Sequence, residues 1–275
     1  MVDQSIPQCD VAVVGGSSTN GIRFPWDVGA TDVTLLGEDL RWETPYGESP
    51  AFAHFTLAGH TILSCAMHGW RLGIPRGLAS QQVFWVLQQA GVTTVIGEGG
   101  VGAVNHLLGL RDVVVVNDYL DLSLRRDISL GTAQLLIMRD AICPRIAAAL
   151  VSAAETVGLG RVFERGVYAV TDGRHFESRA EVAALRMWGA DVVGQSLAPE
   201  VYLAREIGAC YAGAYLVVNY AEGVVRDWQH EELAEIFHQD ARAAGALLVE
   251  AIRRLDASLP CHCRELRKPT LLRGV

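Results

Sequence analysis

The stretch GVYAVTDGRHFESRAE, residues 166–181, joins two patterns that belong to different secondary structures. Residues 166–170 form a short apolar run typical of a buried strand, and the residues after the polar turn open a helix that we expect over 178–188. A strand that leads through a turn into a helix is the repeating unit of an α/β fold. The turn itself carries an aromatic ring beside a carboxylate, Phe176 and Glu177.

The same alternation of short apolar runs and longer helical stretches extends over the chain on both sides of this segment. We expect strands over residues 10–14, 32–36, 61–65, 94–97, 112–118, 166–170, 191–194 and 210–218, and helices over 78–90, 143–157, 178–188, 199–207 and 229–255. No repeat or low-complexity linker divides the chain. The sequence therefore predicts one α/β domain, residues 1–259, with a mixed central sheet flanked by helices, followed by a basic and loosely held C-terminal tail, residues 260–275.

Composition limits the classes of partner. The chain has 275 residues, half of them hydrophobic, and a net charge of -8, which argues against nucleic acid or an anionic membrane as the main partner. An anionic ligand would have to be held locally, by backbone N–H groups and a few side chains. No apolar run approaches the roughly 20 residues of a membrane-spanning helix, and the first residues lack a signal-peptide pattern. We expect a cytoplasmic protein.

The six cysteines have irregular spacings, and several lie inside apolar runs where a reduced thiol packs as a small hydrophobic group. We expect all six to be free thiols. Cys261 and Cys263 form a C-x-C pair, which is weak as a metal signal because the sequence shows no second ligand pair beside it. The prediction is a flexible tail and no metal site.

Two glycine-rich segments follow expected strands at positions where a ligand could approach the backbone. Gly15 and Gly16 are followed by Ser17, whose hydroxyl and neighbouring N–H groups suit an oxyanion; the alternative is an ordinary turn. Residues 97–102 contain four glycines around Glu98, which leaves a flat patch of backbone. Glu98 is then either a surface carboxylate or a base in a pocket.

The opening stretch and two later positions carry groups that match a purine with a 6-oxo group. Phe176 offers a face for stacking, and Glu177 can accept hydrogen bonds from a donor edge. The amide of Asn219, at the end of the last long strand, can meet N7–H and O6 together. His230, at the start of the long helix, could reach a sugar hydroxyl. The alternatives are a core aromatic, a helix N-terminal acid and a surface histidine.

Taken in order, several motifs resemble the trimeric purine nucleoside phosphorylase and methylthioadenosine phosphorylase family over nearly the whole chain, up to about Leu255. The matching stretches are VVGGSS, ETPYGESP, AMHGW, GVYAVTDGRHFESRAE, WGADVVGQSLAPEVYLAREIG, LVVNYAEG and HEEL. The resemblance implies one α/β domain around a distorted central sheet, a homotrimer, and cleavage of the N-glycosidic bond of a purine nucleoside, with phosphate as co-substrate and no cofactor.

The resemblance also implies a role for each matched residue. It places the base on Phe176, Glu177 and Asn219, the ribose on Gly100, Gln195 and His230, and the phosphate on Ser17, His68 and Ser196. Asn219 would stabilise the charge that develops on the leaving base. Glu177, Asn219 and His230 all favour an inosine- or guanosine-like nucleoside.

Three positions depart from the family pattern. Met67 replaces an arginine that would hold phosphate through a bidentate fork, and Glu98 brings a carboxylate near the expected phosphate. Gln195 replaces a methionine that packs on the ribose.

These departures leave three interpretations open. Phosphate could still bind with Arg71 or Arg76 supplying charge, giving free base and ribose 1-phosphate. Water could instead replace phosphate, with Glu98 or His68 as the general base of a nucleoside hydrolase. The third is a homologue that binds a nucleoside without cleaving it. Phosphorolysis of a 6-oxopurine nucleoside is our preferred interpretation, and a 5′-modified nucleoside such as methylthioinosine or methylthioadenosine is an alternative substrate.

Overall fold

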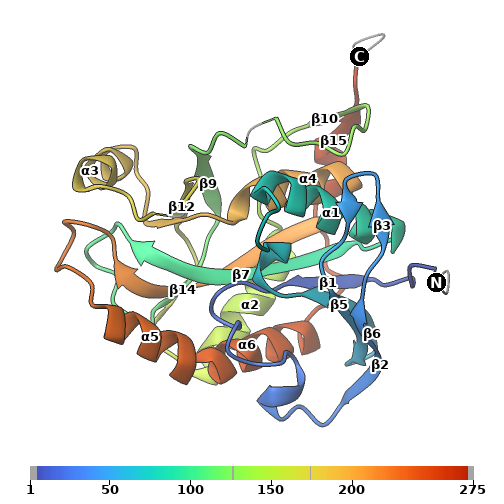
Figure 1. Ribbon diagram of the computed structural model, residues 1–275, viewed down its shortest axis with the longest axis horizontal. Helices are drawn as coiled ribbons and strands as arrows, with labels where there is room; N and C mark the ends of the chain where they lie inside the picture. The colour runs from blue at the N-terminus through green and yellow to red at the C-terminus, as the bar shows by residue number, and fades with distance from the viewer. Residues whose placement is uncertain (1–4, 126, 174, 272–275) are drawn as a thin grey trace.

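A computed structural model describes residues 5–125, 127–173 and 175–271, and it contains a mixed sheet of eleven strands with helices on both faces (Figure 1). The sheet strands are β1 (Val11–Val14), β2 (Val33–Leu40), β5 (Phe52–Leu57), β6 (His60–Cys65), β7 (Thr94–Ala103), β8 (Val113–Val115), β9 (Asp118–Asp121), β11 (Val162–Phe163), β12 (Val167–Val170), β13 (Val192–Gly194) and β14 (Cys210–Tyr220). Two small ribbons pair β3 (Glu43–Thr44) with β4 (Gly47–Glu48) and β10 (Gln134–Leu136) with β15 (Arg267–Pro269).

The sheet branches at β7. Its main path runs β11-β8-β14-β7-β1-β6-β5-β2, and β6, β1, β7 and β14 are parallel neighbours. The far end of β7 also pairs antiparallel with β13, which continues to β12 and β9. The prediction of a mixed, distorted central sheet in a single α/β domain is confirmed. The carboxyl ends of the parallel strands meet at this branch, where ligands of such sheets bind.

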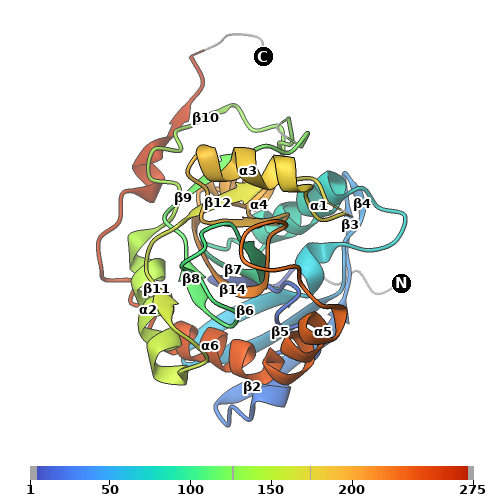
Figure 2. The same ribbon diagram turned by 90° about the vertical axis from the view of Figure 1, so that its left-hand side faces the viewer.

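The helices cover both faces of the sheet. In Figure 1, α1 (Arg76–Gln89) and α4 (Leu197–Ile207) lie on one side, and α2 (Pro144–Val157), α5 (His230–Gln239) and α6 (Ala241–Arg253) lie on the other. Figure 2 shows α3 (Arg179–Met187) beside β12, where Val182 and Leu185 pack with Ala169 and Val193 in a small second core. Three 3-10 helices complete the elements: η1 (Trp26–Val28), η2 (Met67–Gly69) and η3 (Cys263–Leu266). Within the described chain, no helix is long and apolar enough to cross a membrane.

Three expected elements have different bounds in the structure. The expected strand over residues 94–97 continues as β7 to Ala103, so the glycine-rich segment is strand and not loop. Glycine is required at position 97 because a Cβ there would lie 2.4 Å from the Tyr211 hydroxyl oxygen of β14. The expected strand over 112–118 is divided between β8 and β9. The helix expected over 229–255 is two helices, α5 and α6, that meet at Asp240.

Of the two strands of the β5–β6 hairpin, the sequence predicts only β6. Residues 61–65 were expected as a strand, but β5 was not, although Phe52, Phe55 and Leu57 of β5 are fully buried. The turn between the strands places Ala58 and Gly59 at φ +52° and +83°, the left-handed pair of a two-residue hairpin turn.

Part of the expected tail packs against the domain. Residues 267–269 form β15 on β10, and Arg267 Nε donates to the backbone carbonyl of Glu206 in α4 at 2.7 Å. Cys263 of η3 is buried. The expectation of a loosely held segment is therefore wrong for residues 263–269; residues 272–275 of the tail and 1–4 of the domain lie outside the described residues.

Candidate active site

A cavity of about 260 Å³ lies where β7, β13 and β14 meet, and residues from both ends of the chain line it. Eight of the ten predicted site residues are in its lining: Ser17, His68, Gly100, Phe176, Glu177, Gln195, Ser196 and Asn219. These residues form two groups at opposite ends of the cavity. One end has an aromatic ring, a carboxylate and an amide, and the other has two hydroxyls and an imidazole.

At the first end, Glu177 is buried and held in place. Thr171 Oγ1 donates to Glu177 Oε1 at 2.6 Å, which fixes the carboxylate and leaves its second oxygen for a ligand donor. The Glu177 position follows from a well-defined helix start, because the next residue, Ser178, caps α3 in a capping box with Glu181.

The amide of Asn219 enters the cavity through an irregularity in β14. The register between β14 and β7 shifts between Val217 and Asn219, a bulge that turns the side chain at 219. Gly102 on β7 makes room for it, since a Cβ there would lie 3.3 Å from Asn219 Nδ2. Nδ2 donates one hydrogen to the carbonyl of Tyr220 at 2.9 Å. Its second hydrogen and the amide oxygen stay available for a ligand.

Aromatic rings wall the outer side of this end. Phe176 is 45% exposed and packs edge-on against Trp228, with ring centroids 4.8 Å apart and planes at 63°. Trp228 is fixed in turn, because its Nε1 donates to Glu222 Oε1 at 2.9 Å. A planar ligand in the cavity would therefore contact two rings held at an angle.

At the other end, His68 belongs to a buried chain of hydrogen bonds. Its Nδ1 lies 2.7 Å from Glu200 Oε1, and these side chains are 4% and 2% exposed. Tyr211 donates to Glu200 Oε2 at 3.0 Å. Burial, together with nearby Tyr215 and Glu200, raises the pKa of Tyr211 well above its ordinary value, so the phenol keeps its proton and remains a donor. The Glu200 carboxylate thus holds the ring and leaves Nε2 toward the cavity.

The backbone that presents His68 is in an unusual conformation. Met67, His68 and Gly69 are consecutive residues at positive φ, +49°, +55° and +71°. Non-glycine residues in this region cost about 1–3 kcal/mol each and persist at positions that the surrounding structure enforces. Gly16 completes the fit, because a Cβ on it would lie 2.5 Å from His68 Nε2.

Two hydroxyls flank the His68 ring. Gly100 N–H donates to Ser17 Oγ at 2.9 Å, which positions that hydroxyl between β1 and β7. Ser196, at the N-terminus of α4, lies 3.3 Å from the Tyr168 hydroxyl oxygen. Burial raises the pKa of Tyr168 to about 12, so this partner is a neutral phenol. The hydroxyls, the imidazole and the N-terminus of α4 together suit an anion.

Of the two arginines considered for charge, only Arg76 lines the cavity. Its guanidinium carbon lies 4.0 Å from the centre of the Trp70 ring, and Nη1 donates to Gln195 Oε1 at 2.5 Å and to the carbonyl of Asp172 at 2.8 Å. Arg71 instead donates to the backbone of Gly69 at 3.1 Å and to Gln82, outside the cavity lining. The expected ribose residue Gln195 therefore anchors Arg76.

The sequence pattern of the phosphorylase superfamily matches residues 11–253, which include all of these elements. The chain belongs to the phosphorylase superfamily. Its members are enzymes, and this chain is one of the pentosyltransferase type. The predicted family resemblance is confirmed.

Relatives within the superfamily cover nearly the whole chain. The protein named "Probable 6-oxopurine nucleoside phosphorylase" from Moorella thermoacetica is 32% identical over 260 residues, which is 92% of this chain and 96% of the relative. "Probable S-methyl-5′-thioinosine phosphorylase" from Methanothermobacter thermautotrophicus is 30% identical over 86% of each chain. The crystal structure of a methylthioadenosine phosphorylase from an antarctic soil metagenomic library superposes with a TM-score of 0.81 at 22% identity, covering 94% of this chain and 91% of that one, and it supports the fold alone.

Two predicted site residues of this superfamily member, Glu98 and His230, do not line the cavity. Glu98 Oε1 accepts hydrogen bonds from Gly16 N–H and from Thr19 Oγ1, the latter at 2.5 Å. The carboxylate faces a small apolar pocket with α6 residues, on the other side of β7. The expectation that Glu98 confronts phosphate or water is therefore wrong for this structure: it stabilises the turn after β1.

His230 is the second such residue. It is exposed at the first position of α5, and the side chains of α5 that line the cavity are Leu233 and Phe237. The helix-start histidine was expected at a sugar hydroxyl, but the inward face of α5 begins one turn later. The end of the cavity near α5 is consequently apolar.

The sequence reasoning missed several residues of the site. Glu200 sits in the first turn of α4, where an acid is ordinarily explained by the helix dipole, and Tyr211 sits in an apolar strand. Trp228 lies in a loop. The i, i+4 spacing of Leu233 and Phe237 was a usable signal for one helix face, although it does not tell a cavity wall from a core.

Proposed function

We propose that this phosphorylase superfamily enzyme is a purine nucleoside phosphorylase that cleaves the N-glycosidic bond of a 6-oxopurine nucleoside, with phosphate as the attacking group. The single observation that carries the proposal is the lining of one cavity by Glu177 and Asn219 at one end and, at the other, by His68, whose ring Glu200 holds from behind. The first end suits a 6-oxopurine and the second suits an anion.

The base end discriminates by hydrogen-bond complementarity. The free hydrogen of Asn219 Nδ2 would donate to O6, and the amide oxygen would accept from N7–H. The free oxygen of Glu177 would accept from the N1–H edge. A 6-amino purine reverses the donor and acceptor at C6, so it would leave a buried polar group unpaired, at a cost of about 1–3 kcal/mol.

The chemistry follows from these positions. As the C1′–N9 bond breaks, its electron pair moves onto the base and C1′ becomes cationic. Asn219 stabilises the charge on the leaving base, which contributes only in the transition state. Phosphate held by Ser17, Ser196 and His68 faces C1′ and forms the new bond, giving ribose 1-phosphate.

Product analysis tests the reaction. Purified protein is incubated with inosine or guanosine, with and without phosphate, and the base and the sugar product are quantified. Phosphate-dependent release of base with ribose 1-phosphate supports the proposal. Failure to release base from inosine, guanosine and methylthioinosine under either condition would refute the 6-oxopurine assignment.

Hydrolysis is a second candidate, and Met67 favours it. Met67 lines the cavity where the family resemblance expects an arginine, so this route to phosphate is lost. Because Glu200 holds Nδ1, a neutral His68 would present the lone pair of Nε2 to a water molecule and act as its general base. Free ribose formed at equal rates with and without phosphate would identify this reaction in the same assay.

A 5′-methylthio nucleoside is favoured as the substrate by a different observation. Leu233 and Phe237 line the cavity, while His230, the expected partner of a 5′-hydroxyl, is exposed. With Glu177 and Asn219 at the base, this combination suits methylthioinosine. Comparing kcat/KM for methylthioinosine, methylthioadenosine and inosine decides between the three, and a preference for inosine would refute the apolar 5′ site.

We also propose a cytoplasmic homotrimer. Leu72 and Leu124 are 92% and 93% exposed. Leu124 N–H donates to Asp172, whose carbonyl accepts from Arg76 at the cavity, so this apolar surface adjoins the site. Large exposed apolar side chains mark surfaces that bind other proteins, so we expect Leu72 and Leu124 to be buried between subunits. Light scattering after size-exclusion chromatography measures the mass, and a monomer at micromolar concentration would contradict the trimer.

A further inference from the structure

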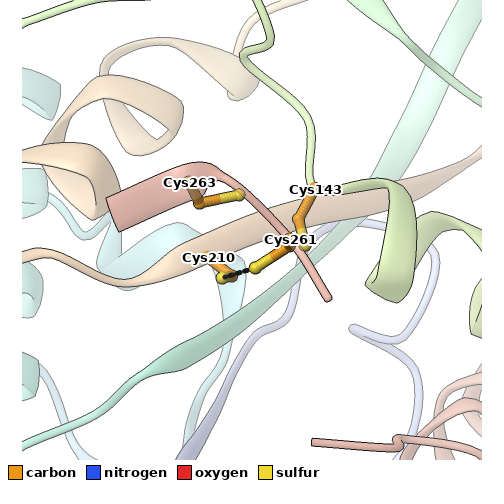
Figure 3. Close-up of side chains that lie close together, drawn as sticks. All are labelled: Cys143, Cys210, Cys261 and Cys263. Atoms are coloured by element: carbon orange, nitrogen blue, oxygen red, sulfur yellow. Dashed lines mark hydrogen bonds between the residues drawn. The ribbon is translucent and has the colours of Figure 1, made fainter. Parts of the chain in front are cut away.

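Four of the six cysteines meet at one point (Figure 3). One of them, Cys210, begins β14, whereas Asn219 near the other end of the same strand lines the cavity. Their Sγ atoms all lie within 4.8 Å of one another, and the Sγ atoms of Cys210 and Cys261 are 3.5 Å apart. Three of the side chains are buried and one is half-buried. We call this group the four-cysteine cluster: Cys143, Cys210, Cys261 and Cys263.

The cluster joins three segments that are distant in sequence. Cys143 precedes α2, Cys210 is the first residue of β14, and Cys261 and Cys263 come from the C-terminal segment. The C-x-C pair was judged weak because the sequence shows no second ligand pair. The fold supplies that pair, and no neighbouring residue pattern in the sequence predicts it.

The sulfur separations match a single tetrahedral ion. Zinc–sulfur bonds of about 2.3 Å place the four sulfurs of a tetrahedron about 3.8 Å apart, so the observed separations require only small side-chain movements. A disulfide needs two sulfurs about 2.05 Å apart, and no disulfide joins the six cysteines in the structure. Each sulfur here has three sulfur neighbours, whereas disulfides would use them in isolated pairs.

One arginine and one helix N-terminus lie beside the cluster. A zinc ion with four thiolates carries a net charge of −2, which needs partners in a buried place. Arg145 Nη2 lies 3.8 Å from Cys210 Sγ. Cys143 is the N-cap of α2, so its thiolate would lie at the positive end of a fourteen-residue helix.

We propose that the four-cysteine cluster is a zinc site with a structural role. Binding displaces the four thiol protons and leaves no open position on the ion, which is the arrangement of structural and not catalytic zinc. The ion ties the C-terminal segment to the starts of α2 and β14. That segment carries β15, the partner of β10, and Arg205 Nη1 donates to the carbonyl of Cys263 at 3.2 Å. The site therefore fixes residues 261–269 on the domain.

Metal analysis of the protein as purified tests the site. The chain is expressed and purified under reducing conditions without chelator or added metal, and zinc is measured by mass spectrometry per mole of chain. We expect about one zinc per chain. The Cys261→Ser/Cys263→Ser variant should lose it, while Cys9→Ser, at a buried cysteine outside the cluster, should retain it. The double variant should cleave nucleoside at the wild-type rate at low temperature and unfold at a lower temperature.

A second measurement keeps the proposal falsifiable if the variant does not fold. Zinc-free wild-type protein is titrated with Co²⁺, and binding of one ion per chain should give the intense visible bands of a tetrahedral thiolate site. Chelator should lower the unfolding temperature of the wild type. Iron in place of zinc, a disulfide within the cluster in non-reducing peptide maps, or four thiols that react freely with no bound metal would each overturn the proposal.

Discussion

The Glu200→Gln substitution separates the two roles that the buried His68–Glu200 pair could have. Gln keeps the size of the side chain and an oxygen that can accept from His68 Nδ1, and it places a neutral NH2 group beside the Tyr211 hydroxyl, so it removes the negative charge. A protonated His68 would then lose its counter-ion inside the protein. If His68 holds phosphate as a cation, the substitution must weaken phosphate binding.

The size of the effect follows from the geometry. Glu200 Oε1 lies 2.7 Å from His68 Nδ1, with both side chains nearly inaccessible to solvent. A hydrogen bond to a charged group contributes about 1.5–3 kcal/mol, and a loss of about 2 kcal/mol corresponds to a change of about 30-fold. We expect the KM for phosphate to rise by about that factor. The KM for the nucleoside should change little, because Glu200 does not line the cavity.

Initial rates of inosine cleavage, measured against phosphate and against inosine, provide the assay. Glu206→Gln is the matched control, because Glu206 is also buried in α4 but its carboxylate accepts from Leu130 and Thr132, away from the cavity. The control should lower stability and leave both KM values unchanged. An unchanged phosphate KM in Glu200→Gln, with the protein folded, would refute a charged His68 as the phosphate ligand.

Three further substitutions test other parts of the site. Asn219→Asp should shift the ratio of kcat/KM for 6-oxo over 6-amino nucleosides by roughly tenfold or more toward the amino substrate, because an aspartate only accepts; an unchanged ratio would show that the base lies elsewhere. Glu98→Gln should leave phosphate kinetics unchanged and alter the thermal unfolding temperature, since the carboxylate faces Gly16 and Thr19; a lost phosphate-dependent rate would contradict this geometry. Met67→Arg should lower the KM for phosphate by adding a bidentate donor, and steady-state rates at several phosphate concentrations measure it.

The base end of the site was predictable because its residues follow strands. Phe176 and Glu177 come after β12 and Asn219 closes β14, so strand order alone brings them to one edge of the sheet. The family resemblance then assigned their partners in the ligand. The burial of Glu177 and its hydrogen bond to Thr171 came only with the structure.

The prediction for Glu98 is wrong because the sequence places the end of the strand at residue 97, whereas β7 continues to Ala103. Nothing local marks residues 97–103 as strand, since glycine is unfavourable there by propensity. Two tyrosines of β14 explain why glycine is found in this strand. Tyr211 occupies the space beside Gly97, and Tyr215 also lies near Gly99. Once this segment is β7, its side chains alternate between faces, and Glu98 turns toward α6. The four-cysteine cluster escaped prediction for a similar reason, because its members meet only in the folded chain.

If phosphate is the co-substrate, as we propose, a chain with a net charge of -8 must bind it without the expected arginine at position 67. Three groups that can bind an anion line one end of the cavity: the His68 ring held by Glu200, the hydroxyl of Ser196 just before α4, and the guanidinium of Arg76. Glu200 lies in the first turn of α4, so one segment carries both Ser196 and the carboxylate that holds the imidazole. Because several groups contribute, replacing any one of them with a neutral residue should weaken anion binding and not abolish it. The other end of the cavity has only one acid and one amide, Glu177 and Asn219, so we expect the loss of either one to have a larger effect on ligand binding.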